Sequence, residues 1–194
     1  TNIDSCLGSM TYQWNLIGGN PSSSILSNPG VISYTSVGQY TVSLDATNEC
    51  ATVTATETFT INSSTSSYDT VTACNSYTWG VNGTTYMQSG TYTDVTTNLW
   101  GCIHTDSMVL TITPQATANA GPTASICAGG TYTITGASSL NNTGVNWTHN
   151  GLGTLSGANT LTPTYQSDPS DGPSVTITLT ATGIIPCPNV SDDM

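Results

Sequence analysis

The stretch GQYTVSL, residues 38–44, places Tyr40, Val42 and Leu44 on one face of an extended chain and polar residues on the other. Apolar side chains at every second position are typical of a β-strand with one buried face. The segment TVTATETFTI, residues 52–61, continues the same period. The two segments therefore predict neighbouring strands of a β-sheet in the first third of the chain.

Period-2 patterns continue along the rest of the sequence. They occur at residues 90–97, 107–113, 131–135 and 175–181. Asn82-Gly83 lies between two such apolar segments and predicts a hairpin turn. Because no stretch sustains the 3.6-residue period of an amphipathic helix, the sequence predicts an all-β protein.

The charge composition excludes several classes of partner. Charged residues make up 6% of the 194 residues, Lys and Arg are absent, and the net charge is −11. Nucleic-acid recognition depends on Lys and Arg at the phosphates, so we expect no nucleic-acid partner. No apolar run reaches the length of about 18 residues that spans a bilayer, so we expect no membrane insertion of this segment.

Six cysteines occur in three successive pairs, each with a Trp between its two members. An even number of Cys, without a C-x-x-C cluster, predicts disulfides formed in an oxidising compartment. Polar segments at residues 62–67 and 114–122 separate the three sets. We therefore predict three modules in an extended tandem array, namely a β-sandwich at residues 1–62, a short disulfide-linked β-repeat at residues 68–113 and a second β-sandwich at residues 119–194. The disulfides expected within them are Cys6–Cys50, Cys74–Cys102 and Cys127–Cys187.

Both ends of the chain carry incomplete modules in this division. The first module opens almost directly on Cys6, and the third stops where a closing strand is expected. We expect either that the chain is a window of a longer polypeptide or that a neighbouring chain supplies the missing strands.

The first module carries a Trp strand, YQWN at residues 12–15, then SYTSVGQYTVSL at residues 33–44, followed by ATN at residues 46–48. In this pattern it resembles a PKD (polycystic kidney disease) domain. The resemblance implies an immunoglobulin-like β-sandwich. Gly18-Gly-Asn20 stands where the family often has Gly-Asp-Gly.

The second module carries CNSYTW, residues 74–79, and SGTYT, residues 89–93; the third carries ICAGGTYT, residues 126–133. With these motifs the second module is similar to a short repeat, and the third to a PKD-like repeat, of giant surface proteins of Bacteroidetes. The resemblance implies a substrate of the type IX secretion system, displayed on the cell surface like a gliding-motility adhesin. It also implies O-glycosylation at Asp-(Ser/Thr)-apolar motifs, which here gives Thr70 and Ser107 as acceptors.

Few residues suggest chemistry. His104 lies between Cys102 and Asp106, but a disulfide-bonded Cys cannot serve as a metal ligand, and we expect no catalytic site. His149 is expected to be an exposed loop residue. Asp168 and Asp171 share a loop and are candidate Ca²⁺ ligands without a complete ligand pattern, so no cofactor is assigned. Trp100 lies outside the Cys–Trp–Cys pattern and is the candidate surface contact.

The sequence predicts a non-catalytic structural and adhesive segment of an extracellular stalk or filament. Its expected partners are other repeats of the same polypeptide or neighbouring filament subunits, together with surface glycans. Two alternatives stay open, namely carbohydrate-binding accessory modules of a secreted hydrolase and a filament subunit completed by strand exchange.

Overall fold

The computed structural model describes residues 8–194, and the described chain is built of strands β1 to β17 without a helix. The predicted all-β fold class is confirmed. Contacts between residues divide the chain into two compact units. In the described part, the first unit holds residues 8–66 and 95–105, and the second holds residues 67–94 and 106–194. The predicted division into three modules stays a prediction.

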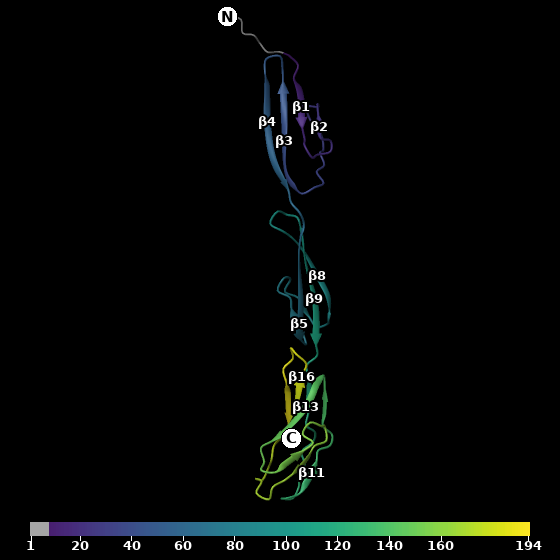
Figure 1. Cartoon of the computed structure of the whole chain (residues 1–194), viewed down its shortest axis with the longest axis vertical. Helices are drawn as coiled ribbons and strands as arrows, with labels where there is room; N and C mark the ends of the chain where they lie inside the picture. The colour runs from purple at the N-terminus through teal and green to yellow at the C-terminus, as the bar shows by residue number, and fades with distance from the viewer. Residues whose placement is uncertain (1–7) are drawn as a thin grey trace. The chain divides into compact units, whose positions relative to one another are not determined.

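A four-stranded antiparallel sheet makes up most of the first unit, in the order β2-β1-β3-β4 (Figure 1). Asn48 closes the hairpin between the two long strands, because its Oδ1 accepts hydrogen bonds from the N–H groups of Cys50 and Ala51, both at 3.0 Å. The strands are β1 (Thr11–Asn15), β2 (Ser23–Ser24), β3 (Gly38–Thr47) and β4 (Thr52–Ile61).

One face of this sheet is apolar because the register aligns the apolar positions of neighbouring strands. Trp14 pairs with Leu44, and Tyr40 pairs with Phe59. The ring of Tyr34 packs on both aromatic residues of the second pair, with centroids 4.6 Å and 4.9 Å away. Within the described part of this unit, Leu16 is nevertheless the only fully buried hydrophobic side chain, at 3% exposure. The first unit therefore has a thin core.

A three-stranded sheet in the order β5-β9-β8 leads into the second unit, which holds the larger part of each strand. The predicted Asn-Gly turn is confirmed, since it joins the short strands β6 and β7, and Gly83 has the positive φ of 71° that such a turn needs. Trp79, Met108 and Leu110 form a buried cluster. The strands are β5 (Thr65–Cys74), β6 (Tyr77–Thr78), β7 (Thr85–Tyr86), β8 (Gly90–Thr97) and β9 (Ile103–Thr113).

Strands β5 and β9 run parallel, as their arrows show in Figure 1. Ser67 Oγ donates to Asp106 Oδ1, and the N–H of Asn75, just beyond β5, donates to the carbonyl of Thr113 at 3.0 Å. Contacts in the same order along both strands are possible only in a parallel pair. Each residue of β5 therefore lies beside a residue about 39 positions later, by the difference between 67 and 106.

The rest of the second unit contains three small sheets, ordered β10-β12, β11-β15-β14 and β13-β16-β17. They enclose a second buried cluster, in which Ile134, Trp147 and Leu179 are at most 3% exposed. The indole N–H of Trp147 donates to the carbonyl of Thr160 at 2.8 Å. The strands are β10 (Thr117–Asn119), β11 (Thr131–Thr133), β12 (Ser138–Leu140), β13 (Asn142–His149), β14 (Thr154–Ser156), β15 (Thr164–Gln166), β16 (Ile177–Gly183) and β17 (Val190–Asp193).

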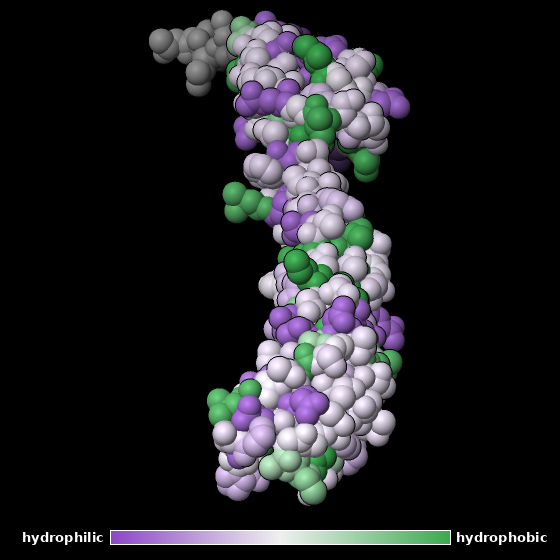
Figure 2. All heavy atoms as spheres, turned by 60° about the horizontal axis from the view of Figure 1, so that its bottom comes forward, coloured by the Kyte–Doolittle hydropathy of each residue, from purple (hydrophilic) through white to green (hydrophobic). Residues whose placement is uncertain are grey.

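The surface carries separate apolar side chains rather than one large apolar patch on the face in Figure 2. Among the described residues, Val31, Leu99 and Ile185 are the most exposed of the large hydrophobic side chains, at 91%, 93% and 88%. No helix long and apolar enough to cross a membrane occurs in residues 8–194.

Candidate functional site

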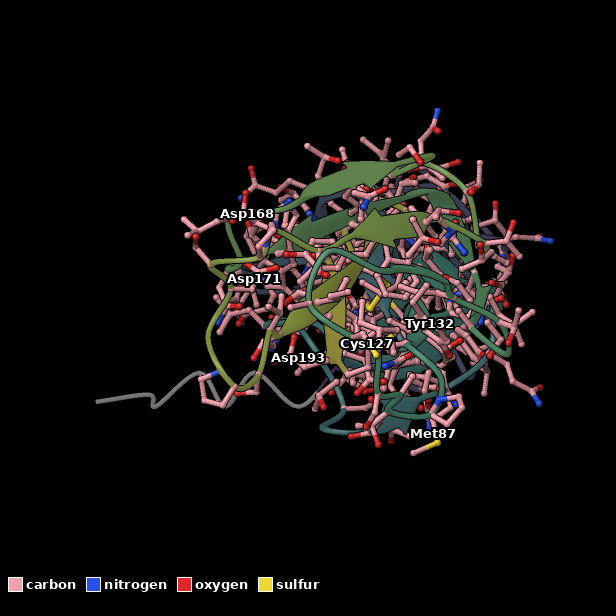
Figure 3. All side chains as sticks on the ribbon, turned by 90° about the horizontal axis from the view of Figure 1, so that it is seen from below. Met87, Cys127, Tyr132, Asp168, Asp171 and Asp193 are labelled. Atoms are coloured by element: carbon pink, nitrogen blue, oxygen red, sulfur yellow. A yellow bond between two sulfur atoms is a disulfide. The ribbon has the colours of Figure 1, made fainter. Side chains whose placement is uncertain are left out.

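The predicted Ca²⁺ ligands Asp168 and Asp171 lie on one loop of the second unit (Figure 3). Asp171 Oδ2 accepts hydrogen bonds from the hydroxyl of Tyr165 at 2.7 Å and from the N–H of Asp168 at 2.9 Å. Its Oδ1 accepts from the N–H of Leu152 at 2.6 Å. The Asp171 carboxylate therefore accepts hydrogen bonds from donors in three segments. These bonds attach its loop to the core.

These hydrogen bonds shift the acidities of both partners. The Tyr165 hydroxyl first, and then the Leu152 N–H, hold the pKa of Asp171 below its ordinary value of 3.8, because they stabilise the carboxylate. Burial first, and then the bond to Asp171, raise the pKa of Tyr165 above its ordinary value of 10.0. The pair is thus set to remain a carboxylate and a neutral phenol near pH 7.

A cavity of about 610 Å³ opens beside this loop in the second unit. Residues 123–128 and 172–177 form much of its wall, together with Tyr132 and Met194. Cys127, labelled in Figure 3, lies on this wall with an exposed free thiol. Across the described residues, no three His, Cys, Asp or Glu side chains gather closely enough to hold a metal ion.

The two histidines have different surroundings. His104, in the first unit, places its Nδ1 2.7 Å from the hydroxyl of Thr65. His149 was expected in an exposed loop, and that expectation is wrong. It is the last residue of β13, its ring lies edge-on to Tyr165 with centroids 5.0 Å apart, and its Nδ1 is buried without a hydrogen-bond partner. The Gly-rich sequence that suggested a loop begins only after His149. His149 therefore still belongs to the strand, and its ring packs against the core.

Trp100, the predicted surface contact, is 61% exposed in a tight loop of the first unit. The side chain of Asn98 organises this loop, since its Oδ1 accepts from the N–H groups of Trp100 at 3.1 Å and Cys102 at 3.0 Å. Leu99 beside it is 93% exposed. The loop therefore presents two adjacent apolar side chains on a backbone fixed by hydrogen bonds.

The predicted O-glycosylation acceptors lie on neighbouring strands of one sheet. Thr70 is exposed on β5, and Ser107 is half-buried on β9. Alternation along each strand puts both on the face opposite the buried Met108 and the half-buried Val71. Glycosylation at these positions stays a prediction.

Two of the predicted disulfides are wrong. Cys74 is bonded to Cys187, 113 positions away, and Cys102 and Cys127 are free thiols. The parallel pairing of β5 with β9 explains the first error, because it sets Cys74 level with Thr113 rather than with Cys102. Cys50 is disulfide-bonded. Its predicted partner, Cys6, lies outside the described residues.

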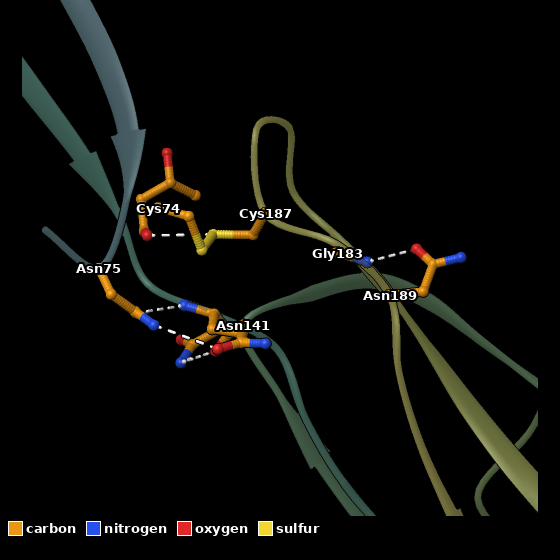
Figure 4. Close-up of a disulfide and its surroundings, with 8 residues drawn as sticks. Cys74, Asn75, Asn141, Gly183, Cys187 and Asn189 are labelled. Carbon is orange, nitrogen blue, oxygen red and sulfur yellow. Dashed lines mark hydrogen bonds between the residues drawn. A yellow bond between two sulfur atoms is a disulfide. The ribbon is translucent and has the colours of Figure 1, made fainter. Parts of the chain in front are cut away.

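The Cys74–Cys187 bridge joins two parts of the second unit that the sequence division kept apart (Figure 4). Cys74 is the last residue of β5, and Cys187 lies three positions before β17. Cys187 is only 6% exposed, and its sulfur lies 3.2 Å from the carbonyl oxygen of Thr113. The bridge is thus packed against the end of β9.

Amide side chains near the bridge hold the segment after β9 in place. Asn75 and Asn141 bind Gln115, which belongs to that segment. The amide of Asn75 pairs with Gln115 twice, through Nδ2 to Oε1 at 3.2 Å and through Oδ1 from the backbone N–H at 3.0 Å. Asn141 Nδ2 donates to the carbonyl of Gln115 at 3.3 Å. Ala116 and Ala120 are at most 4% exposed. Residues 114–120, part of the polar joint predicted at residues 114–122, therefore form a hydrogen-bonded connection with two buried alanines. We call residues 113–120 together with the bridge the clamped joint.

Comparison with known proteins supports part of the predicted resemblance. The family model described as "PKD domain" matches residues 4–61. The match covers the first module and less than half of the chain.

A solved structure, "Drosophila OTK, extracellular domains 3-5", is similar at 10% identity over 100% of this chain and 86% of that chain, with a TM-score of 0.37. A search of curated proteins finds no match.

Proposed function

We propose that this chain is a non-catalytic structural segment of an extracellular adhesive stalk or filament. The clamped joint is the observation that supports this role most directly. A disulfide and a set of amide hydrogen bonds fix a connection between strands that would otherwise be a flexible linker. Such a connection allows the segment to transmit force along the chain without a flexible linker in the path. The disulfides also favour an oxidising, extracellular location.

The finer proposal is a cell-surface protein of the gliding-motility adhesin type from Bacteroidetes, secreted by the type IX system. The PKD match at residues 4–61 is compatible with this type. We propose Thr70 and Ser107 as O-glycosylation acceptors within it. The partners would be other repeats of the same polypeptide or neighbouring subunits.

We propose the loop with Leu99 and Trp100 as the adhesive contact. Its two apolar side chains are exposed, and Asn98 holds the backbone in place, so little conformational entropy is lost on binding. An exposed Trp is typical of an interface anchor or of a surface that stacks on a sugar ring.

A flow-chamber experiment tests the stalk role. In the polypeptide that carries this segment, residues 8–194 would be replaced by a Gly/Ser linker of equal length, and cell attachment measured under increasing shear. We expect detachment at lower shear, and unchanged attachment would contradict the proposal.

Trp100→Ala in the intact polypeptide tests the contact separately. Glycan-array binding by residues 1–194 that Trp100→Ala abolishes would identify the partner of this contact as a glycan. A hydrolase domain in the same polypeptide would favour the accessory-module alternative instead.

A further inference from the structure

We propose that the Cys74–Cys187 disulfide is a load bypass, which carries tension past residues 75–186. The proposal rests on the stalk role only for its biological use. The mechanics follow from the covalent path: tension applied at the two ends of the chain reaches Cys74 along β5, crosses the sulfur–sulfur bond, and leaves from Cys187 along β17.

The bypassed loop contains almost all of the buried core of the second unit. Strands β6 to β16 lie inside it, and so do both buried clusters, with Met108, Leu110, Ile134 and Leu179 among the most buried side chains. Only β5 and β17 stand outside the loop in this unit. Tension along the chain therefore pulls directly on two edge strands, whereas the strands that carry the fully buried residues lie inside the closed loop.

The positions of the two sulfurs make this path direct. Without the bridge, tension would run through β9 and then through residues 113–117 into the sheets beyond. With the bridge, the end of β5 is tied to a buried residue that contacts Thr113. Asn75 and Gln115 add hydrogen bonds at the same point. The clamped joint thus holds the entry and the exit of the loop together, so the loop has no ends across which it can be stretched.

The bypass has a measurable length. The two cysteines are 113 positions apart. A fully extended chain spans about 3.3–3.6 Å per residue, so the intact bridge hides roughly 370–410 Å of extensible chain.

Single-molecule force spectroscopy on residues 1–194, held by handles at both ends, tests the proposal. All variants carry Cys102→Ser and Cys127→Ser, which removes the free thiols that could exchange with the bridge. Adding Cys74→Ser and Cys187→Ser should lengthen the fully stretched chain by about 400 Å. This length depends on covalent connectivity alone, so it is informative even if the quadruple variant folds poorly. Equal lengths with and without the two cysteines would overturn the proposal.

A second measurement asks whether the core stays folded under tension. Ile134→Cys places a thiol at a position with 0% exposure inside the loop. In the chain with the bridge, we expect a thiol reagent to label it as slowly under force as at rest. Faster labelling under force would contradict the bypass. Both measurements use the isolated chain, so they can fail while the flow-chamber result stands, and the reverse also holds.

Discussion

In the first unit a single sheet buries Leu16 and stacks Tyr34 on Tyr40 and Phe59, whereas the second unit has two buried clusters and a disulfide across 113 positions. Both units use the same alternating Thr-rich strands. The comparison shows that strand pattern alone does not determine how firmly a β-unit is held. The amount of buried apolar side chain and the span of the disulfide also matter, and the two buried clusters and the bridge across 113 positions lie in the second unit.

The largest expected effect comes from removing the bridge. Cys74→Ser with Cys187→Ser should lower the free energy of unfolding of the second unit by about 4–5 kcal/mol, because a loop of this length constrains the unfolded chain strongly. Urea denaturation followed by the fluorescence of Trp79 and Trp147 measures it, in a background with Trp14→Phe and Trp100→Phe. The first unit, in which Cys50 stays disulfide-bonded, is the control. In the reciprocal background, with Trp79→Phe and Trp147→Phe, the fluorescence of Trp14 and Trp100 should show an unchanged midpoint for this unit.

A core truncation in each unit gives the next effect. Leu179→Ala should cost the second unit about 2–5 kcal/mol, since Leu179 has 0% exposure in a closely packed cluster. Leu16→Ala should cost the first unit about 2 kcal/mol or less, because few buried neighbours surround the cavity and they can relax into it. Equal losses in the two units would show that the core of the first unit is as firmly packed as that of the second.

The local strands and the hairpin turn could be predicted from the sequence, whereas the clamped joint could not. The apolar alternation at residues 38–44 and 52–61 predicted strands that lie within β3 and coincide with β4. Asn82-Gly83 predicted the hairpin correctly. These features are local, so a short stretch of sequence contains the information that determines them.

The clamped joint was missed because it depends on pairing between distant segments. A period-2 pattern does not say whether two strands run parallel, and the parallel pair of β5 and β9 is what separates Cys74 from Cys102. The roles of Asn75 and Asn141 were equally hidden. Both have a positive φ, 61° and 53°. Asn tolerates this conformation better than most residues, so the residue type Asn was the one local signal in the sequence.

Two tyrosines of the first unit should give smaller effects of opposite sign. The hydroxyl of Tyr34 is buried without a hydrogen-bond partner, so Tyr34→Phe should stabilise this unit by about 1 kcal/mol. The hydroxyl of Tyr40 donates to the carbonyl of Ser36 at 2.8 Å, so Tyr40→Phe should destabilise it by about 0.5–1.5 kcal/mol. Chemical denaturation of the two variants side by side measures both, and a loss of stability in Tyr34→Phe would indicate that its hydroxyl is paired in solution.

The smallest expected effect is a pH dependence confined to the second unit. The pKa of Asp171 is lowered on folding, so its contribution is present above its ordinary value of 3.8 and is lost as the pH falls through the lower, folded value. The pKa of Tyr165 is raised, so its contribution is present below 10.0 and is lost as the pH rises through the higher, folded value. The melting temperature of the second unit should therefore decrease at both extremes of pH and stay level between them.

Asp171→Asn should lower that plateau in the melting temperature and remove the share of the acid decrease that Asp171 causes, because the variant has no carboxylate to protonate. If the acid decrease were unchanged in Asp171→Asn, other carboxylates would be its cause, and the bond between Asp171 and Tyr165 would add no stability to the second unit beyond that of its core and its bridge.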